Sequence, residues 1–289
     1  EMSASLVGSE MCIRDSAYIP AERNAVTLPN IASLKMPEYN TRSFIFDWLE
    51  VHQKFQKKNA VDLLKLKLKY YYDESSQKDM IVLEDGKEIG LEEASSGLQS
   101  VVPLYVYVYY LTHWIYDHQE DISFEKKDRI EGALSREYIK MFSKQMNVVM
   151  DEEFLNQAVK EAKLSPGFKK ILGTAKTLKK AGNDSLDNLL ETVLELEENI
   201  SHPHYSNIIV EEPELNLFPE TQKDLIYDLL EMINSGRDHL LMTTHSPYLL
   251  YALNNCMLGA LVQENIPEEE EGLQKMKDSF VKPEDVSVW

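Results

Sequence analysis

The sequence predicts an α/β fold with a parallel-sheet core, and three neighbouring segments near its C-terminal end carry that prediction. Residues 206–211 contain a continuous apolar, β-branched run, which is typical of a strand buried in a parallel sheet. Residues 219–235 indicate a helix that ends at Gly236. Residues 239–244 form a second apolar run. Strand, helix and strand in this order predict a βαβ unit with parallel strands and a right-handed crossover.

The composition predicts a chain that buries a sizeable core. Its 289 residues are 43% hydrophobic, enough for one large or two ordinary domains, and no apolar run is long enough to span a bilayer. The net charge of -19 disfavours binding to nucleic acid, and the lysine-rich stretch 54–69 is more simply the solvated face of a helix. Cys12 and Cys256 have no metal or redox spacing and no signal peptide is evident, so we expect a cytoplasmic protein without membrane partners.

Shorter elements are predicted along the N-terminal part of the chain. Residues 17–23 indicate a short strand that enters a proline-led turn. Residues 43–72 indicate a helical region, because most of their apolar side chains recur at helical spacing. Residues 80–89 predict a β-hairpin that turns at Asp85 and Gly86.

The middle of the chain is predicted to be mostly helical, with one ambiguous segment. Residues 93–99 favour a turn and the start of a helix. In residues 101–116 the alternation of Tyr with Val and Leu favours a strand, whereas the length of the run permits a buried helix. Residues 120–182 and 185–200 are predicted helical, and residues 286–289 are predicted to form a final strand.

Two adjacent acids, Glu211 and Glu212, follow the first strand of the βαβ unit directly. Paired carboxylates at the carboxyl end of a parallel strand suit a metal–nucleotide site, where one holds Mg²⁺ and the other orients or deprotonates a water molecule. The alternative is a strand that simply runs into an acidic surface loop. These two residues alone leave both interpretations open.

Further polar residues favour the first interpretation. His245 follows the second strand, and both strands of a βαβ unit end at the same edge of the sheet, where α/β folds bind ligands. A neutral imidazole there could hydrogen-bond a terminal phosphate oxygen or the attacking water. Ser95, Ser96 and Gly97 precede a predicted helix, and this arrangement makes either an anion site or an ordinary helix cap.

Together these motifs resemble the ATPase head of the ABC superfamily, in the branch that includes SMC, RecF and OLD-type proteins and bacterial AAA-type ATP-binding proteins. Residues 208–212 resemble the Walker B strand, and residues 213–219 resemble the D-loop that follows it. Residues 95–99 resemble the signature motif, and His245 matches the switch histidine. The resemblance covers roughly residues 17–256 and implies an ABC-type P-loop NTPase head with a parallel-sheet core, a helical lobe and insertions.

The resemblance also implies roles for individual residues. Glu211 is the Mg²⁺-side acid, Glu212 is the catalytic glutamate that polarises water, and His245 assists. ATP binding is expected at Ser95, Ser96, Gly97, Gln99 and, near the Q-loop position, Arg23. In this chain Asn216 and Phe218 stand where family members often have His, and Leu98 replaces the second glycine of the signature motif.

One family part has no counterpart in this sequence, because no Gly-x-x-x-x-Gly-Lys-Ser/Thr loop occurs in it. The first 16 residues resemble translated sequencing adaptor rather than native protein, so we expect that the phosphate-binding loop lies upstream of this chain. The chain as it stands should then bind ATP poorly or not at all. We expect a truncated ATPase domain at 17–256 and a C-terminal extension, also truncated, at 257–289.

Within that domain, the resemblance implies a helical lobe at about 30–75, a helical insertion at about 120–200 and the Walker B to switch-histidine core at 206–256. The intact protein should hydrolyse ATP between two heads of a homodimer. The rival function is a sensor or scaffold that binds nucleotide without turnover, and a third is an ATP-gated, OLD-like nuclease component, in phage defence or DNA repair. Nucleic acid or an effector protein would then bind through regions outside this chain.

Overall fold

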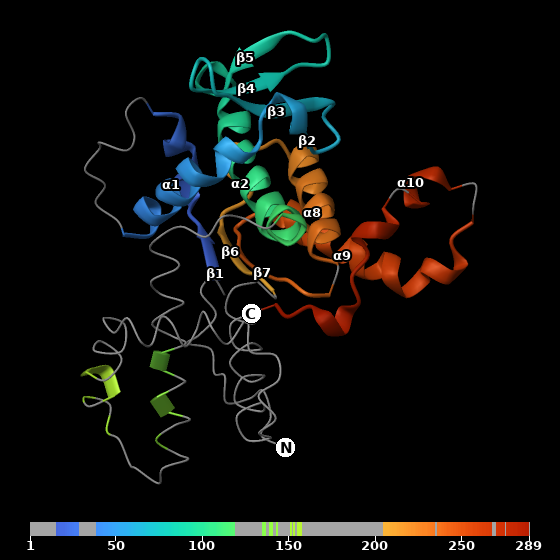
Figure 1. The fold of residues 1–289 in the computed structure, drawn as a ribbon. Helices are drawn as coiled ribbons and strands as arrows, with labels where there is room; N and C mark the ends of the chain where they lie inside the picture. The colour runs from blue at the N-terminus through green and yellow to red at the C-terminus, as the bar shows by residue number, and fades with distance from the viewer. Residues whose placement is uncertain are drawn as a thin grey trace, which may run out of the picture. The chain divides into compact units, whose positions relative to one another are not determined.

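The computed structural model describes residues 16–28, 39–118, 205–234, 236–267, 270–274 and 276–288, together with isolated positions between 135 and 157 (Figure 1). The chain divides into two compact units. One comprises Ser16–His118 and Tyr205–Trp289, and the other comprises Glu1–Asp15 and Gln119–His204. The helices predicted at 120–182 and 185–200 lie outside the described residues, apart from those isolated positions. All the elements named below belong to the first unit.

A three-stranded parallel sheet forms the centre of this unit. Its strands lie in the order β1 (Ser16–Ile19), β6 (Asn207–Glu211) and β7 (His239–Thr243). Both pairings are parallel, and the helix α8 (Pro219–Ile233) connects β6 to β7. Ile208 and Val210 of β6 are buried in the same apolar core as residues of α8. The predicted α/β fold is confirmed, and it is consistent with a P-loop NTPase-like architecture.

Helix α8 ends as its sequence predicts. Gly236 has φ +72° and donates its backbone N–H to the carbonyl of Ile233. A residue with a side chain is strained in this left-handed conformation, so glycine suits the position. The chain then enters β7 and continues into α9 (Pro247–Val262), which packs on α8 through a second apolar cluster containing Leu249 and Cys256.

A four-stranded antiparallel sheet forms a separate layer of this unit, next to α1 (Tyr39–Val51) (Figure 1). Its strands are consecutive in the chain: β2 (Val61–Leu63), β3 (Leu68–Asp73), β4 (Lys78–Val82) and β5 (Glu88–Gly90). The turn between β4 and β5 contains Gly86 at φ +81°, so the predicted hairpin is confirmed.

The predicted helical region at 43–72 is wrong beyond Val51. Strands β2 and β3 occupy much of the remainder, and Leu64 (φ 49°) and Lys67 (φ 54°) make the turn between them with left-handed backbone angles. The leucines of this segment fit a helical stripe, but the aromatic run that begins at Tyr70 favours a pleated strand. Pairing with β4 therefore outweighs the local helical spacing.

The ambiguous segment 101–116 is helical. Helix α2 runs from Ser96 to Tyr109, a π-helical turn follows at Tyr110–Trp114, and α3 (Ile115–Asp117) completes the run. Every residue from Val101 to Val108 is buried, so the alternation of Tyr and Val reflects a helix that is apolar on all sides rather than a strand.

Short elements complete the described part of the chain. The 3-10 turns are Ala21–Thr27, His52–Lys54, Lys57–Asn59, Leu91–Glu93, Gln263–Asn265, Lys277–Ser279 and Pro283–Asp285. A last short helix, α10, spans Glu271–Gln274. The predicted C-terminal strand is wrong for the positions described, because residues 286–288 pair with no strand there. No helix within these described ranges is long and apolar enough to cross a membrane.

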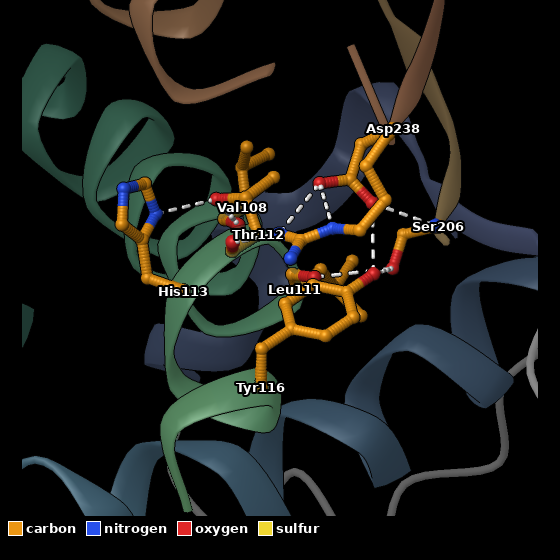
Figure 2. Close-up of polar contacts among 8 residues, drawn as sticks. Val108, Leu111, Thr112, His113, Tyr116, Ser206 and Asp238 are labelled. Atoms are coloured by element: carbon orange, nitrogen blue, oxygen red, sulfur yellow. Dashed lines mark hydrogen bonds and ion pairs between the residues drawn. The ribbon is translucent and has the colours of Figure 1, made fainter. Parts of the chain in front are cut away.

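A buried carboxylate fixes the beginnings of β6 and β7 (Figure 2). The Asp238 side chain is fully buried and accepts hydrogen bonds from the Tyr116 hydroxyl at 2.8 Å and from the Ser206 backbone N–H at 2.7 Å. Arg237 donates to the same carboxylate at 3.2 and 3.3 Å and lies over the Tyr116 ring, with its guanidinium carbon 3.2 Å from the ring centroid. The carboxylate is thereby paired and hydrogen-bonded, as a buried charge requires.

Two residues of this group, Arg237 and Ser206, also donate hydrogen bonds to the π-helical turn. Arg237 donates to the carbonyl of Thr112 at 2.7 Å, and the Ser206 hydroxyl donates to the carbonyl of Leu111 at 3.1 Å (Figure 2). A π-helical turn departs from the regular hydrogen-bonding pattern, so its carbonyls depend on such partners. The end of α2 is thus joined to the edge of the parallel sheet where β6 and β7 begin.

Asp228 of α8 should make the stability of this unit depend on pH. Its side chain is almost fully buried beside the Tyr105 hydroxyl, and Lys65 lies 4.0 Å away. Burial, opposed mainly by Lys65, raises the pKa of Asp228 from its ordinary 3.8 to about 6. The folded state therefore binds this proton more tightly than the unfolded state does. This contribution to stability is complete below pH 4 and is lost as the pH rises through 6.

We expect Asp228→Asn to remove that pH dependence. The free energy of unfolding of the wild type should fall by roughly 2–3 kcal/mol between pH 4 and pH 7 relative to the variant. Urea unfolding at a series of pH values measures the difference. Glu220→Gln, an exposed acid on the same helix that does not act on the pKa of Asp228, is the matched control and should keep the pH dependence of the wild type. A difference between wild type and Asp228→Asn that is constant with pH would contradict this assignment.

Candidate functional site

The two acids and the histidine-bearing loop leave the parallel sheet at the same edge. Glu211, the last residue of β6, pairs in register with Thr243, the last residue of β7. The backbone N–H of Glu212 extends the ladder by donating to the carbonyl of Thr243 at 2.9 Å. The shared edge inferred from the βαβ unit is therefore present, and His245 follows it within two residues of Thr243.

Glu212 has an unusual backbone conformation. Its φ of 41° lies in the left-handed region, which residues other than glycine adopt rarely and at an energetic cost. The carbonyl of Glu212 accepts the backbone N–H of Leu215 at 3.1 Å and a guanidinium N–H of Arg23 at 3.0 Å. The tight turn after β6 thus fixes where the second acid stands.

Arg23 stabilises this turn through hydrogen bonds to its backbone. The residue is 0% exposed, and its guanidinium donates at 2.9–3.2 Å to backbone carbonyls only: those of Pro20, Ser100, Glu211, Glu212 and Pro213. Burial lowers the pKa of Arg23 to about 10, although the charges of Glu214 and Glu212 oppose that shift. A guanidinium has five N–H donors, and all are engaged here. The expectation that Arg23 binds nucleotide is not supported by this geometry, which gives Arg23 a structural role.

The two acids differ in their surroundings. The Tyr18 hydroxyl hydrogen-bonds the Glu211 side chain, and burial, followed by that bond, raises the pKa of Tyr18 to about 12. Glu211 is therefore oriented by a neighbouring phenol. The Glu212 side chain is partly exposed, and the described part of the chain offers its carboxylate no hydrogen-bond partner. One carboxylate is held in place and the other is open to a ligand.

Glu214 connects the turn after β6 to the loop after β7. Its Oε1 accepts the Thr244 hydroxyl at 2.8 Å and the His245 backbone N–H at 2.7 Å. Its Oε2 is buried and has no hydrogen-bond partner within the described ranges. His245 is an exposed residue, whereas its backbone N–H is held by Glu214.

The start of α9 is anchored next to the same loop. The Ser246 hydroxyl caps the helix by accepting the Tyr248 N–H at 3.2 Å, and it donates to Oε1 of Gln222 at 2.5 Å. The Ser246 backbone N–H donates to the Thr244 hydroxyl at 2.9 Å. Helices α8 and α9 therefore both restrain the loop that carries His245.

The start of α2 meets the D-loop-like segment. A Cβ on Gly97 would lie 3.0 Å from the carbonyl of Asn216, so a larger residue would crowd this contact. The Asn216 amide donates to the Ser100 hydroxyl at 2.9 Å, and Asn216 has φ 64°, which Asn tolerates better than most residues. Ser95 caps α2 through the Leu98 N–H at 3.4 Å.

Ser95 and Ser96 are exposed at this helix start, whereas Gln99 is turned away from it. The Gln99 amide nitrogen donates to the carbonyls of Glu92 at 3.0 Å and Ala94 at 3.1 Å. Both amide hydrogens are used in the preceding turn, and only the Gln99 Oε1 remains available to a ligand. The predicted anion site thus rests on the two serines and the nearby backbone N–H groups.

Sequence reasoning therefore located the acids, the histidine and the helix start, but it missed the residues that join them. Glu214 and Asn216 lie inside the segment that resembles the D-loop, so the motif marked their position without indicating their partners. Tyr18 lies in the segment that resembles the Q-loop region, which gave no sign of its contact with Glu211. Ser100 lies in no motif, and its contact with Asn216 joins segments 116 residues apart.

Glu211 and Glu212 suit an Mg²⁺ ion that is bound together with a nucleotide. The described residues include no cluster of three or more His, Cys, Asp or Glu side chains that could enclose a metal. Mg²⁺ bound with a nucleotide uses one or two carboxylates and takes its other ligands from phosphates and water. Glu211 and Glu212 provide that number of carboxylates, one oriented and one open.

Comparison with protein-family models matches residues 115–250 to the AAA ATPase domain. The matched range contains Glu211, Glu212, Glu214 and His245, and it leaves out the start of α2. A search of curated proteins gave no match. The family match supports an AAA-type ATPase, and such proteins bind and hydrolyse ATP, typically with Mg²⁺.

Proposed function

We propose that this protein hydrolyses ATP as an ABC- or SMC-like head, at the edge where β6 and β7 end. The observation that carries the proposal is the pair Glu211 and Glu212, held by backbone hydrogen bonds beside the loop of His245. Adjacent acids on a rigid strand end, next to an exposed imidazole, form a set of groups suited to phosphoryl transfer to water.

Each residue has a distinct part in this proposal. Glu211, oriented by Tyr18, is the residue that would hold Mg²⁺, directly or through water. The bound ion would supply positive charge to the phosphate oxygens. The Glu212 carboxylate orients the attacking water and accepts its proton, since it is open to a ligand and fixed in position by its turn. The His245 imidazole donates a hydrogen bond to a terminal phosphate oxygen.

We propose that a second copy of the chain contributes a further anion-binding surface to the site. The exposed Ser95 and Ser96 and the first backbone N–H groups of α2 form an anion site at a helix start. In the proposed homodimer this surface of one head binds the ATP that lies on the acids of the other. We propose a cytoplasmic protein, in agreement with its acidic composition.

The test is ATP turnover by the product of the complete open reading frame. We expect phosphate release that requires Mg²⁺ and stops when EDTA is added, together with association into dimers when ATP is present. Glu220→Gln, an exposed acid in the first turn of α8, is the matched control and should have no effect. ATP binding without turnover would favour the sensor or scaffold function, and the lack of any ATP binding would overturn the proposal.

A further inference from the structure

The Glu214 side chain is the one direct side-chain link that the described residues show between the turn after β6 and the loop after β7. Its two hydrogen bonds, to the Thr244 hydroxyl at 2.8 Å and to the His245 N–H at 2.7 Å, converge on the same oxygen. One donor is a side chain and the other is backbone. Together they fix both the separation of the two loops and the path of the chain into His245.

The hydroxyl of Thr244 is directed toward Glu214 by its other neighbour. It accepts the Ser246 N–H at 2.9 Å, so its own hydrogen is free to point at the Glu214 carboxylate. The Ser246 hydroxyl in turn donates to Gln222 of α8. This chain of hydrogen bonds holds residues 244–246 between Glu214 on one side and α8 on the other.

The charge of Glu214 has a nearby counterpart. Among the charges that raise the pKa of Arg23, that of Glu214 contributes most. Arg23 itself binds the carbonyls of Glu211 and Glu212. Arg23 therefore holds the backbone of the turn that carries the two acids, and its charge acts favourably on the Glu214 carboxylate, which offsets part of the cost of placing that carboxylate in a partly buried position.

We propose that Glu214 is a positioning residue that holds the backbone of His245 so that its imidazole and the Glu212 carboxylate face one ligand. The expected effect of Glu214 on ATP turnover rests on the proposed function. Glu214 acts through His245 and does not itself contact the phosphate. Its negative charge strengthens both hydrogen bonds, because hydrogen bonds to an ionised acceptor are stronger than those to a neutral one.

The first experiment needs no nucleotide. In Glu214→Gln, which keeps the shape of the side chain and a neutral acceptor, we expect the His245 amide to exchange its hydrogen about tenfold faster or more. We also expect the imidazole NMR signals of His245 to shift. Thr244→Val removes one of the two donors and should give a smaller change. In the double variant the two effects should be less than additive, because the residues share one hydrogen-bonded group.

The control is Glu220→Gln, which should leave the exchange and the imidazole signals unchanged. Unaltered His245 signals and exchange in folded Glu214→Gln would overturn the inference. If Glu214→Gln does not fold, the inference is tested with Thr244→Val instead. Unchanged hydrogen exchange of the His245 amide in that variant would likewise overturn it.

The second experiment joins the inference to turnover. In the complete gene product, Glu214→Gln should lower kcat about tenfold or more while KM for ATP stays within about twofold, because positioning of His245 acts on the chemical step. A rise in KM with unchanged kcat would contradict a positioning role. If the wild type shows no turnover, the proposed function fails, whereas the NMR result still stands on its own.

Discussion

Replacement of Glu212 by Gln should reduce the rate of ATP hydrolysis by the complete gene product about 10²–10⁴-fold, the usual contribution of a positioned general base. The amide has the size of the carboxylate but cannot accept a proton from water. The backbone turn at Glu212 should persist, because its hydrogen bonds to Arg23 and Leu215 use the carbonyl and not the side chain. Single-turnover measurements at saturating ATP report the effect on the chemical step.

ATP should still bind to the Glu212→Gln variant, and the nucleotide-bound dimer should persist longer because hydrolysis no longer separates it. Glu211→Gln should differ, since it is expected to raise the Mg²⁺ concentration needed for half-maximal turnover. Equal turnover rates in wild type and Glu212→Gln would rule out the assignment of Glu212 as the general base, whatever the effect of Glu211→Gln.

Replacement of Arg23 by Met should remove a large part of the folding stability. Five backbone carbonyls lose a hydrogen bond from a charged donor, although that of Glu212 keeps the Leu215 N–H, and each lost bond costs about 1.5–3 kcal/mol. Even with partial relaxation, we expect the free energy of unfolding to fall by about 4 kcal/mol or more, against a total of about 5–15 kcal/mol for a typical domain. Urea unfolding, followed by circular dichroism, measures the loss.

Two further variants make that measurement specific. Arg42→Met replaces an exposed arginine of α1 and should change stability by less than about 0.5 kcal/mol. Arg23→Lys keeps the charge but has fewer donors, so it should fall between the wild type and Arg23→Met. A stability of Arg23→Met equal to that of Arg42→Met would show that the carbonyls do not depend on the guanidinium.

The parts of the fold that could be predicted are those governed by short-range rules. The βαβ unit follows from two apolar runs and a helix ended by Gly236, and the hairpin follows from Asp85 and Gly86. Residues 61–72 could not be predicted correctly, since their leucines satisfy a helical stripe as well as a strand. Only pairing between β3 and β4, which brings Tyr70 opposite Ile81, decides that segment.

In the candidate site, too, the features set by short-range rules could be predicted and those set by contacts between distant segments could not. Parallel strands end at one edge, so Glu211, Glu212 and the loop of His245 could be grouped from sequence alone. The role of Arg23 could not, because its partners lie 77 residues away at Ser100 and 188 residues away at Glu211. Periodicity and motif spacing contain no information on contacts between such distant segments, and the sequence therefore suggested a ligand contact for a residue that binds backbone.

The buried Asp238 has a consequence for motion at the opposite edge of the sheet. Asp238 immediately precedes β7, its carboxylate binds the N–H of Ser206 before β6, and the Ser206 carbonyl accepts the N–H of His239. These hydrogen bonds hold the two strands in register, and a shift of one residue would also turn the buried side chains of β6, Ile208 and Val210, outward. Any rearrangement during a catalytic cycle must then occur as bending of the turns after Glu211 and Thr243, over a sheet that stays in register.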